Sequence, residues 1–563
     1  MRIPSPFLAT SLSLAMAISL HAQTPAPNPF GIGADNQTSQ AWSKWLPQMG
    51  SIGITEVRGL RSGWGDVEPE EGKWAWDRLD NQLRDAEAQR VHFTGLLVYL
   101  AGWDKKDKRG GLPVNALPEW SEYVTQIVKH TAGRVKYFEV WNEPPNFTNN
   151  APPEDYAKVV AASYNAAKAA NPACMVGIAA QSNNVYYMEQ AIKAGAADHF
   201  DYITLHPYEI LGGVNHGEEA VYMSIVPTMR KMLAAQDPGR LNAPIWFTEL
   251  GTEISDKVSA EDQARALVKG YTMGIAQGVA CIQWFECMDG DSGKMGLLER
   301  GGAPRPAYVA MAQMIKVFGP HPAYVGWVLL NDRDYGFVFK GAAGTILSTW
   351  AQPGAADNVS FGQSVQITDP LTGSSMNAGA CVLTNSPVLI TGVPDALAAQ
   401  AQANRNQPFP WGGDYTDAKS VSVTFGKTNI EKGLHTKSGA AVAGEVMAYG
   451  GSVRPGDVPG GNVFMVDPNF LSYTTTPIEI TVVVRRNPNN DNAGFGLKYE
   501  STGGYKGVGW YTVPDNKEWH TKTWRIDDAQ FTGKWGFNFS LDSDGNQYNK
   551  YYIQSVTVTK VGK

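Results

Sequence analysis

Cysteine is scarce in this sequence of 563 residues, which contains only Cys174, Cys281, Cys287 and Cys381. This number is too small for a disulfide-based scaffold. A hydrophobic core must therefore hold the chain together. One disulfide remains possible, but Cys281 and Cys287 lie on one expected strand and its exit, which disfavours their pairing. The spacing of cysteines does not resemble a zinc site, and we expect no metal and no other cofactor.

Positive charge is also low, with a formal net charge of −7 at pH 7. This balance argues against a nucleic-acid partner and gives no indication of binding to an anionic membrane. Beyond the N-terminus no run approaches the roughly 20 apolar residues of a membrane span, so we expect no membrane partner. Composition leaves the oligomeric state open.

The first 23 residues have the pattern of a secretory signal peptide. A basic start at Met1-Arg2 precedes an apolar run from Phe7 to Leu20, and the small residue Ala22 follows. The run is too short to be a comfortable membrane anchor. We therefore expect cleavage near Ala22 or Gln23 and a secreted or periplasmic protein.

What the sequence does contain is a long alternation of short apolar strands and amphipathic helices. Eight rounds can be counted, with strands near 30–33, 55–58, 91–98, 137–141, 175–179, 202–206, 245–249 and 281–286. Helices are expected at 39–49, 77–89, 120–131, 153–170, 187–194, 219–235, 259–277 and 307–318. This order predicts an α/β fold, a (β/α)₈ TIM barrel over residues 24–318. The alternative, a doubly wound sheet, usually has a glycine-rich phosphate loop, into which Gly31-Ile32-Gly33 does not continue.

The helical pattern ends near residue 319, and short β-like runs follow. We expect two all-β sandwich domains, a small one over 319–405 and a jelly-roll-like one over 406–563. The Ala/Gln-rich segment 396–406 is expected to be a linker or a short surface helix.

Two glutamates end strands on the same face of the expected barrel. Glu143, in Trp141-Asn142-Glu143-Pro144, follows the fourth strand, and Glu249 closes the seventh. Catalytic groups of such barrels lie at the C-terminal ends of the strands. Two carboxylates facing each other there are what cleavage of a glycosidic bond needs, one protonated and one ionised.

These motifs resemble those of the retaining glycoside hydrolases of clan A. The similarity extends to Arg58-Gly59-Leu60, 64–69, 72–76, His206-Pro207-Tyr208, Trp284-Phe285-Glu286, 296–298 and 305–308. The trailing sandwich with the run 368–373 is similar to enzymes near glycoside hydrolase family 39 and its polysaccharide-degrading relatives.

The resemblance implies roles for the residues at the barrel mouth. Glu143 would be the acid/base, with a pKa raised by partial burial and by the neighbouring carboxylate, and Glu249 the nucleophile, about 5–5.5 Å away. Asn142 would bind the sugar 2-hydroxyl. Arg58 would keep Glu249 ionised, or else serve as a buried partner of Glu139.

Aromatic and histidine side chains would complete the site. His206 and Tyr208 would orient the nucleophile or a sugar hydroxyl, and Trp284 would form the floor under the sugar unless it fills the barrel interior. Trp64 and Trp103 are candidates for outer subsites, or for packing.

Further acids follow the seventh and eighth strands: Glu253, Glu286, Asp289 and Asp291. They could bind sugar hydroxyls, tune the acid, or be solvated loop charges. In the last domain, Trp510, Trp519, Trp524 and Trp535 could form a carbohydrate-binding face or a core, and 542–546 is expected to be a turn rather than a calcium loop.

The sequence thus predicts an endo-acting hydrolase of β-linked polysaccharide or oligosaccharide. Three alternatives stay open: an exo-acting enzyme of the β-xylosidase or β-glucosidase type, a non-catalytic carbohydrate-binding protein, and a transglycosylase. The identity of the sugar stays open as well.

Overall fold

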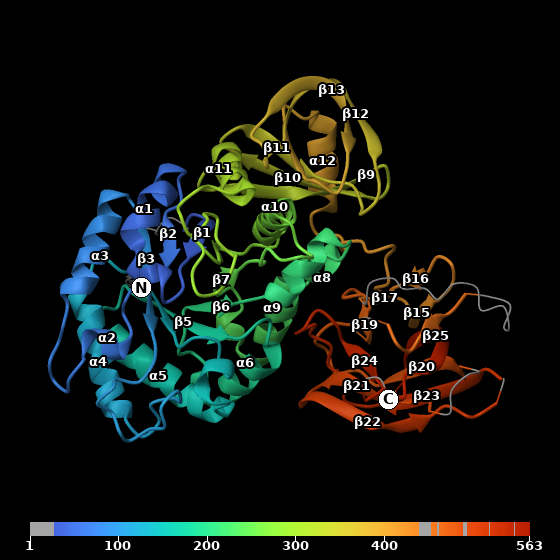
Figure 1. The fold of residues 1–563 in the computed structure, drawn as a ribbon, viewed down its shortest axis with the longest axis horizontal. Coiled ribbons are helices and arrows are strands. Elements are labelled where there is room, and N and C mark those ends of the chain that lie inside the picture. The colour runs from blue at the N-terminus through green and yellow to red at the C-terminus, as the bar shows by residue number, and fades with distance from the viewer. Residues whose placement is uncertain are drawn as a thin grey trace, which may run out of the picture.

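The computed structural model describes residues 27–437, 452–458, 461–487, 492–516, 518–544 and 547–562. The expected signal peptide lies outside these residues. Figure 1 shows a barrel, coloured blue to green, followed by two regions built mainly of strands.

Eight parallel strands form a closed barrel in sequence order. They are β1 (Phe30–Gly33), β2 (Glu56–Arg58), β3 (His92–Leu97), β4 (Tyr137–Val140), β5 (Met175–Ala180), β6 (Tyr202–Leu205), β7 (Ile245–Leu250) and β8 (Cys281–Trp284). The strands are almost entirely buried, as expected for a parallel sheet covered on both faces. The predicted fold class, a TIM barrel followed by all-β domains, is confirmed.

Helices surround the barrel. They are α1 (Trp42–Ser51), α2 (Trp64–Val67), α3 (Asp77–Ala88), α4 (Leu117–His130), α5 (Pro153–Ala170), α6 (Val185–Ala191), α7 (Tyr208–Leu211), α8 (Glu219–Met223), α9 (Ile225–Gln236), α10 (Ala260–Ala276) and α11 (Pro306–Phe318). Short turns of other helix types occur at η1 (Thr38–Gln40), η2 (Asn146–Thr148), η3 (Ile192–Ala196), η4 (Gly212–Asn215) and η5 (Pro238–Arg240). Among the described helices, none combines the length and apolarity needed to cross a bilayer.

Local chemistry explains where several helices begin. Ser259 caps α10 with a reciprocal capping box to Asp262, as the Ser259 start signal indicated. The single helix expected at 219–235 is instead two, because Pro227 lies in the first turn of α9, where a proline is tolerated only if the helix starts afresh.

The second region forms one six-stranded antiparallel sheet in the order β13-β12-β14-β11-β10-β9. Its strands are β9 (Ala323–Leu330), β10 (Asp334–Gly341), β11 (Gly344–Thr349), β12 (Asp357–Thr368), β13 (Ser375–Leu383) and β14 (Val388–Thr391). In place of a second sheet, helix α12 (Asp395–Asn404) packs against this one, because Leu397, Ala398 and Ala401 give it an apolar face. The expected linker or surface helix is therefore part of this core.

The last region is a sandwich of two antiparallel sheets around its own core. One sheet contains β15 (Ser420–Thr424), β16 (Ile430–Lys432), β18 (Arg454–Pro455), β20 (Ile478–Arg486), β23 (His520–Ile526) and β25 (Tyr551–Lys560). The other contains β17 (Leu434–Thr436), β19 (Asn462–Val466), β21 (Gly494–Ser501), β22 (Gly504–Thr512) and β24 (Phe539–Asp542).

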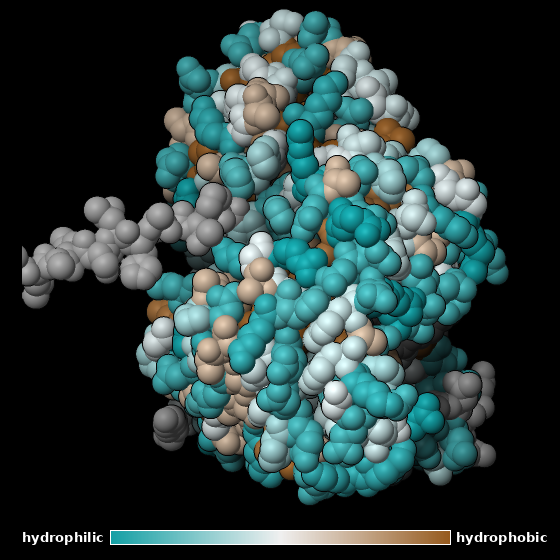
Figure 2. Space-filling view, turned by 90° about the vertical axis from the view of Figure 1, so that its left-hand side faces the viewer, coloured by the Kyte–Doolittle hydropathy of each residue, from teal (hydrophilic) through white to brown (hydrophobic). Residues whose placement is uncertain are grey.

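All four cysteines are free, and three of them are buried. The disulfide that the sequence left open is therefore not formed, and the packing of the hydrophobic cores carries the stability. On the side of the molecule drawn in Figure 2 the surface is mostly hydrophilic, with apolar residues scattered among polar ones.

Candidate active site

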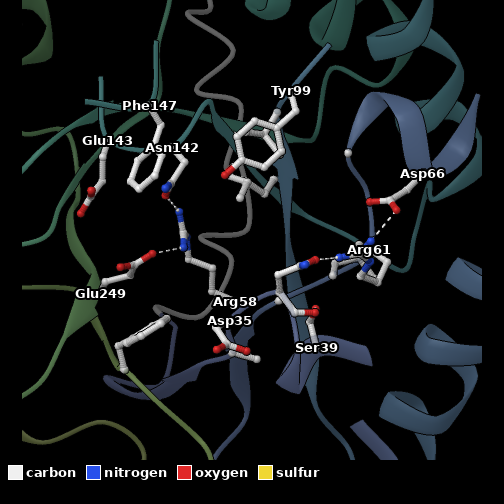
Figure 3. A pocket seen from close by; sticks show the side chains of 18 of the residues that line it. Asp35, Ser39, Arg58, Arg61, Asp66, Tyr99, Asn142, Glu143, Phe147 and Glu249 are labelled. Carbon is white, nitrogen blue, oxygen red and sulfur yellow. Dashed lines mark hydrogen bonds and ion pairs between the residues drawn. The ribbon is translucent and has the colours of Figure 1, made fainter. Parts of the chain in front are cut away.

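Glu143 and Glu249 meet at the mouth of the barrel, as predicted from their places after β4 and in β7. The ligating atoms of Glu143, His206 and Glu249 all lie within 4.8 Å of one another. Figure 3 shows both carboxylates directed toward the same pocket, with Arg58 reaching from Glu249 to Asn142. Closure of the barrel brings residues more than a hundred positions apart into one site.

The chain leaves β4 through an unusual backbone turn. Trp141 has φ of 67° and Glu143 φ of 46°, the left-handed region that non-glycine residues rarely adopt. The turn is fixed by the Trp141 amide, which donates to the Leu97 carbonyl at 2.8 Å, and by the Trp141 indole, which donates to the Phe147 carbonyl at 2.7 Å. This geometry directs Glu143 into the mouth.

Arg58 connects Glu249 to Glu139 and Asn142 at the base of the pocket. Its Nη1 lies 2.5 Å from Glu249 Oε1, its Nη2 donates to Asn142 Oδ1 at 2.7 Å, and its Nε donates to Glu139 Oε2 at 3.0 Å. Burial opposes the charge of Arg58, but Glu139 and Glu249 outweigh it and raise the pKa of the guanidinium. Both partners that the sequence offered for Arg58 are thus engaged at once.

Glu249 is held on its second oxygen by Tyr208, whose hydroxyl donates to Oε2 at 2.8 Å. With Arg58 on Oε1, the carboxylate is fixed in orientation and has a cation beside it. Because Arg58 already supplies this positive charge, the cluster of Glu143, His206 and Glu249 suits proton exchange better than metal binding.

His206 contacts Glu143 more closely than it contacts Glu249. Its Nδ1 lies 2.8 Å from Glu143 Oε1 and 3.5 Å from Glu249 Oε2, and its Nε2 lies 3.0 Å from Thr248 Oγ1. Burial alone would raise the pKa of Glu143, but the hydrogen bond and charge of His206 lower it. Burial would likewise lower the pKa of His206, but Glu249 and Glu143 raise it.

The expectation of a raised Glu143 pKa is therefore wrong for the unliganded protein. A basic partner within hydrogen-bond distance outweighs both burial and the neighbouring carboxylate. The contact between His206 and Glu143 therefore favours the form of the pair in which the imidazole is protonated and the carboxylate is ionised.

The pocket in front of the carboxylates has a volume of about 610 Å³. Its aromatic lining comes from Tyr99, Phe147 and Phe285, of which Tyr99 is 48% and Phe147 46% exposed. The sequence reasoning missed these three side chains. Phe285 directly follows β8 and Tyr99 comes two residues after the end of β3, so the position after a strand end was the available signal.

The pocket continues past Arg58 to a polar end lined by Asp35, Asn36, Ser39, Arg61, Asp66 and Ser292. Arg61 lies 2.5 Å from both Asn36 Oδ1 and Asp66 Oδ1. Figure 3 shows this cluster on the far side of Arg58 from Glu143 and Glu249.

Three tryptophans expected at the sugar site do not line the pocket. Trp284 and Trp64 are both 0% exposed and belong to the barrel core, so neither can stack on a ligand. Trp103 packs edge-on against Trp64 at 5.3 Å and donates to the Glu68 carbonyl at 2.9 Å. The packing alternatives hold for Trp284, Trp64 and Trp103.

Glu286 is buried beside the pocket instead of facing into it. Its Oε2 accepts from Thr38 Oγ1 at 2.9 Å and its Oε1 from the Gly290 amide at 3.2 Å. Burial, helped by the charge of Asp35, raises the pKa of Glu286 to about 8. With this burial and these contacts Glu286 supports the loop after β8 and does not line the pocket.

The remaining acids near β7 and β8 divide into two kinds. Asp289 is buried and paired with Arg305 at 2.5 and 2.6 Å, a structural contact. Glu253 and Asp291 are exposed.

The four tryptophans of the last domain do not form one face. Trp524 is buried in the sandwich core, Trp519 and Trp535 are half-buried, and Trp510 on β22 is 48% exposed. Of the expected turn at 542–546, Gly545 and Asn546 lie outside the described residues.

No protein-family model and no curated protein matches this chain. Among solved structures, a family 39 glycoside hydrolase from the gut symbiont Bacteroides cellulosilyticus WH2 is similar, with a TM-score of 0.56 and 20% identity over 66% of this chain and 81% of that one. The chain shares the fold of that enzyme.

Two weaker similarities are to a GH39 enzyme from Xanthomonas axonopodis pv. citri and to the catalytic domain of GH30 xylanase C from Talaromyces cellulolyticus. The first has a TM-score of 0.47 and 17% identity over 66% of this chain and 95% of that one. The second has a TM-score of 0.47 and 15% identity over 66% and 97%.

Proposed function

We propose that this protein is a retaining glycoside hydrolase that cleaves β-linked polysaccharide or oligosaccharide by double displacement. The observation that carries the proposal is the close approach of Glu143 and Glu249, whose oxygens lie within 4.8 Å of each other. Retaining enzymes separate the two carboxyl groups by about 5–5.5 Å, whereas inverting ones need about 6.5–9.5 Å to admit a water. The spacing supports direct attack on the sugar.

The two carboxylates have different partners, as their roles require. Glu249, fixed by Arg58 and Tyr208, attacks the anomeric carbon and forms a glycosyl–enzyme ester while the bond to the leaving oxygen breaks. Glu143 gives its proton to that oxygen. In the second half-reaction Glu143 takes a proton from water, and the resulting hydroxide releases the sugar from Glu249.

His206 supplies the proton that Glu143 lacks at rest. A bound sugar excludes water from the pair, and a low-polarity environment favours the neutral imidazole and carboxylic acid over the ion pair. Substrate binding therefore moves the proton from His206 Nδ1 to Glu143 Oε1 over the 2.8 Å contact. Asn142, oriented by Arg58, is positioned to bind the sugar 2-hydroxyl.

The extent of the pocket supports endo-action. Its polar end at Arg61 and Asp66 lies beyond the catalytic pair, which leaves room for more than one sugar unit. An exo-acting β-glycosidase would use the same two glutamates and release a monosaccharide, so the product profile separates the two.

The test is product analysis on a panel of β-linked polysaccharides, namely xylan, mannan, cellulose and mixed-linkage glucan. We expect the wild type to release oligosaccharides of retained anomeric configuration from at least one of them. Glu143→Gln and Glu249→Gln should abolish this release, while Glu253→Gln, an exposed glutamate four residues beyond Glu249, should not. An inverted product contradicts the retaining mechanism, and transfer of sugar to added alcohol in preference to water indicates a transglycosylase. Binding with no turnover on any polysaccharide indicates a non-catalytic carbohydrate-binding protein.

We also infer export from the signal-like pattern of residues 1–23. Expression of the full chain should yield a protein that starts near Gln23 or Thr24, as measured by intact mass. Retention of Met1 on the exported protein would contradict this inference.

A further inference from the structure

The C-terminal sandwich is docked onto the catalytic side of the barrel. The Ser182 hydroxyl, just after β5, lies 2.9 Å from the Lys534 carbonyl and 2.7 Å from the Glu209 carboxylate. The neighbouring Asn183 donates to the Thr532 carbonyl at 3.3 Å. Glu209 follows Tyr208, which binds the nucleophile, so the sandwich reaches the strand exits next to the active site; Figure 1 shows the two bodies side by side.

The docked loop of the sandwich is rigid. Glu500, only 4% exposed, accepts hydrogen bonds from the amides of Thr532, Gly533 and Lys534 at 2.8–2.9 Å and from Asn538 Nδ2 at 2.8 Å. A buried carboxylate with this many donors fixes the backbone around it. The surface that the sandwich presents to the barrel is therefore preformed.

Between the two bodies lies a cavity of about 230 Å³. Barrel residues on one side and sandwich residues on the other line it, chiefly Pro145, Asn184, Tyr186, Tyr505, Gln530 and Lys534. Tyr186 and Tyr505 are half-buried, and the Tyr505 hydroxyl donates to the Phe537 carbonyl at 2.9 Å. Tyrosine rings combined with amide and amine groups are the lining that a hydroxyl-rich ring requires, and the volume suits a single sugar unit.

The position of the cavity relative to the catalytic pair defines which part of a substrate could reach it. Pro145 comes two residues after Glu143. The residue after Pro145, Asn146, connects this turn to Glu143, because its Nδ2 lies 3.3 Å from Glu143 Oε2. The polar end at Arg61 and Asp66 lies on the far side of Arg58 from Glu143 and Glu249. The leaving part of a substrate departs on the side of the acid that protonates it.

We propose that this cavity is a subsite for a sugar unit in the leaving part of the substrate, so that the sandwich forms part of the substrate groove. The proposal rests on the function proposed above. The ligand is an uncharged pyranose or furanose unit, because the described lining includes one cation, Lys534, and one acid, Glu500, and so has no excess of one charge. Stacking on Tyr186 and Tyr505 would hold the ring.

The test compares two substrates made of the sugar that the wild type cleaves: a nitrophenyl β-glycoside, which has no sugar on the leaving side, and an oligosaccharide of six units. Tyr505→Ala and Tyr186→Ala should lower kcat/KM about tenfold on the hexamer and less than about twofold on the nitrophenyl glycoside. Tyr505→Phe, which keeps the ring, should behave as wild type on both. Trp510→Ala, which removes an exposed ring from β22 of the same sandwich, is the matched control and should change neither rate.

Each other outcome contradicts the subsite. Equal losses on both substrates mean that the tyrosines only support the fold, and unchanged rates mean that the cavity does not contact substrate. A loss confined to Trp510→Ala assigns carbohydrate binding to the exposed strand instead. A wild type that cleaves no polysaccharide of the panel contradicts the hydrolase function itself, whereas an active wild type with unaffected tyrosine variants contradicts the subsite alone.

Discussion

The barrel has a pocket at each end, and the larger one is not the candidate active site. The pocket at the N-terminal ends of the strands measures about 820 Å³, against about 610 Å³ at the mouth. Among its described lining residues the single acid is Glu56, whose Oε1 lies 3.5 Å from His92 Nδ1, near Arg134 and Lys136. Burial raises the pKa of Glu56 in spite of His92.

The difference between the two ends shows what marks a site for this chemistry. At the mouth two carboxylates share one pocket but have unlike partners, an arginine for Glu249 and a histidine for Glu143. At the other end Glu56 contacts one histidine, His92, and no second acid is among the described lining residues. Volume does not distinguish the ends; the pairing of two acids in unequal environments does.

The largest effect that separates the two ends is expected from removal of one carboxylate at each. Glu249→Gln should lower kcat by about 10⁴-fold or more, because no other group can form the ester. Glu56→Gln should leave kcat within about twofold of wild type. Steady-state kinetics on the polysaccharide that the wild type cleaves measures both; similar losses would place catalysis at the wrong end.

Replacement of one arginine at each end should give the next largest difference. Arg58→Lys should lower kcat/KM about 10²-fold, because an ammonium cannot span Glu249, Asn142 and Glu139 as the guanidinium does. Arg134→Lys, which lines the other pocket and contacts Asp80 on the barrel surface, should cost less than about twofold. Thermal melting of both variants checks that the fold is kept, and equal rates for the two would refute the role of Arg58.

A smaller effect, on stability, is expected from Glu286. Its pKa of about 8 lies above the 4.5 of an ordinary glutamate, so its contribution to stability is complete below pH 4.5 and is lost as the pH rises to 8. Glu286→Gln removes this loss. The unfolding free energy of the variant relative to wild type should therefore rise by about 3 kcal/mol between pH 5 and 8 in urea titrations; a constant difference would argue against a neutral Glu286.

The smallest effect is a shift in the pH profile. The His206–Glu143 pair keeps its proton below the raised pKa of His206, so kcat/KM of the wild type should fall at a pH above 6.5. His206→Asn should move this alkaline limb down by about one unit or more, since a carboxyl then titrates in place of an imidazolium. His92→Asn, at the other end, should leave the alkaline limb unchanged. If His206→Asn also leaves it unchanged, His206 does not hold the proton that Glu143 donates.

Much of this architecture follows from the sequence because the signals are regular. Eight strand–helix rounds specify a barrel, and a barrel fixes which strand ends share a face. The convergence of Arg58, Asn142, Glu143, His206 and Glu249 was therefore predictable before any distance was known.

What could not be predicted depends on side-chain direction and on coupling between groups. Trp284 ends β8 and points into the core, while the adjacent Phe285 lines the pocket, and sequence does not show which of two neighbouring rings turns outward. The lowered pKa of Glu143 arises from a histidine 63 positions away. The sequence also does not show that the apolar face of α12 packs on the sheet of the middle domain, where a second sheet was expected.

The left-handed turn at Trp141 and Glu143 has a consequence for variants selected under heat. A non-glycine residue with left-handed backbone angles costs about 1–2 kcal/mol. Two such residues, Trp141 and Glu143, flank Asn142 at the centre of the site. Glycine at position 143 would relieve the backbone and remove the acid in one step. A library of this protein screened only for thermal tolerance should thus accumulate inactive members at 143, but not at 141, where the buried indole of Trp141 holds the turn. The position of these members would mark the site without any substrate in hand.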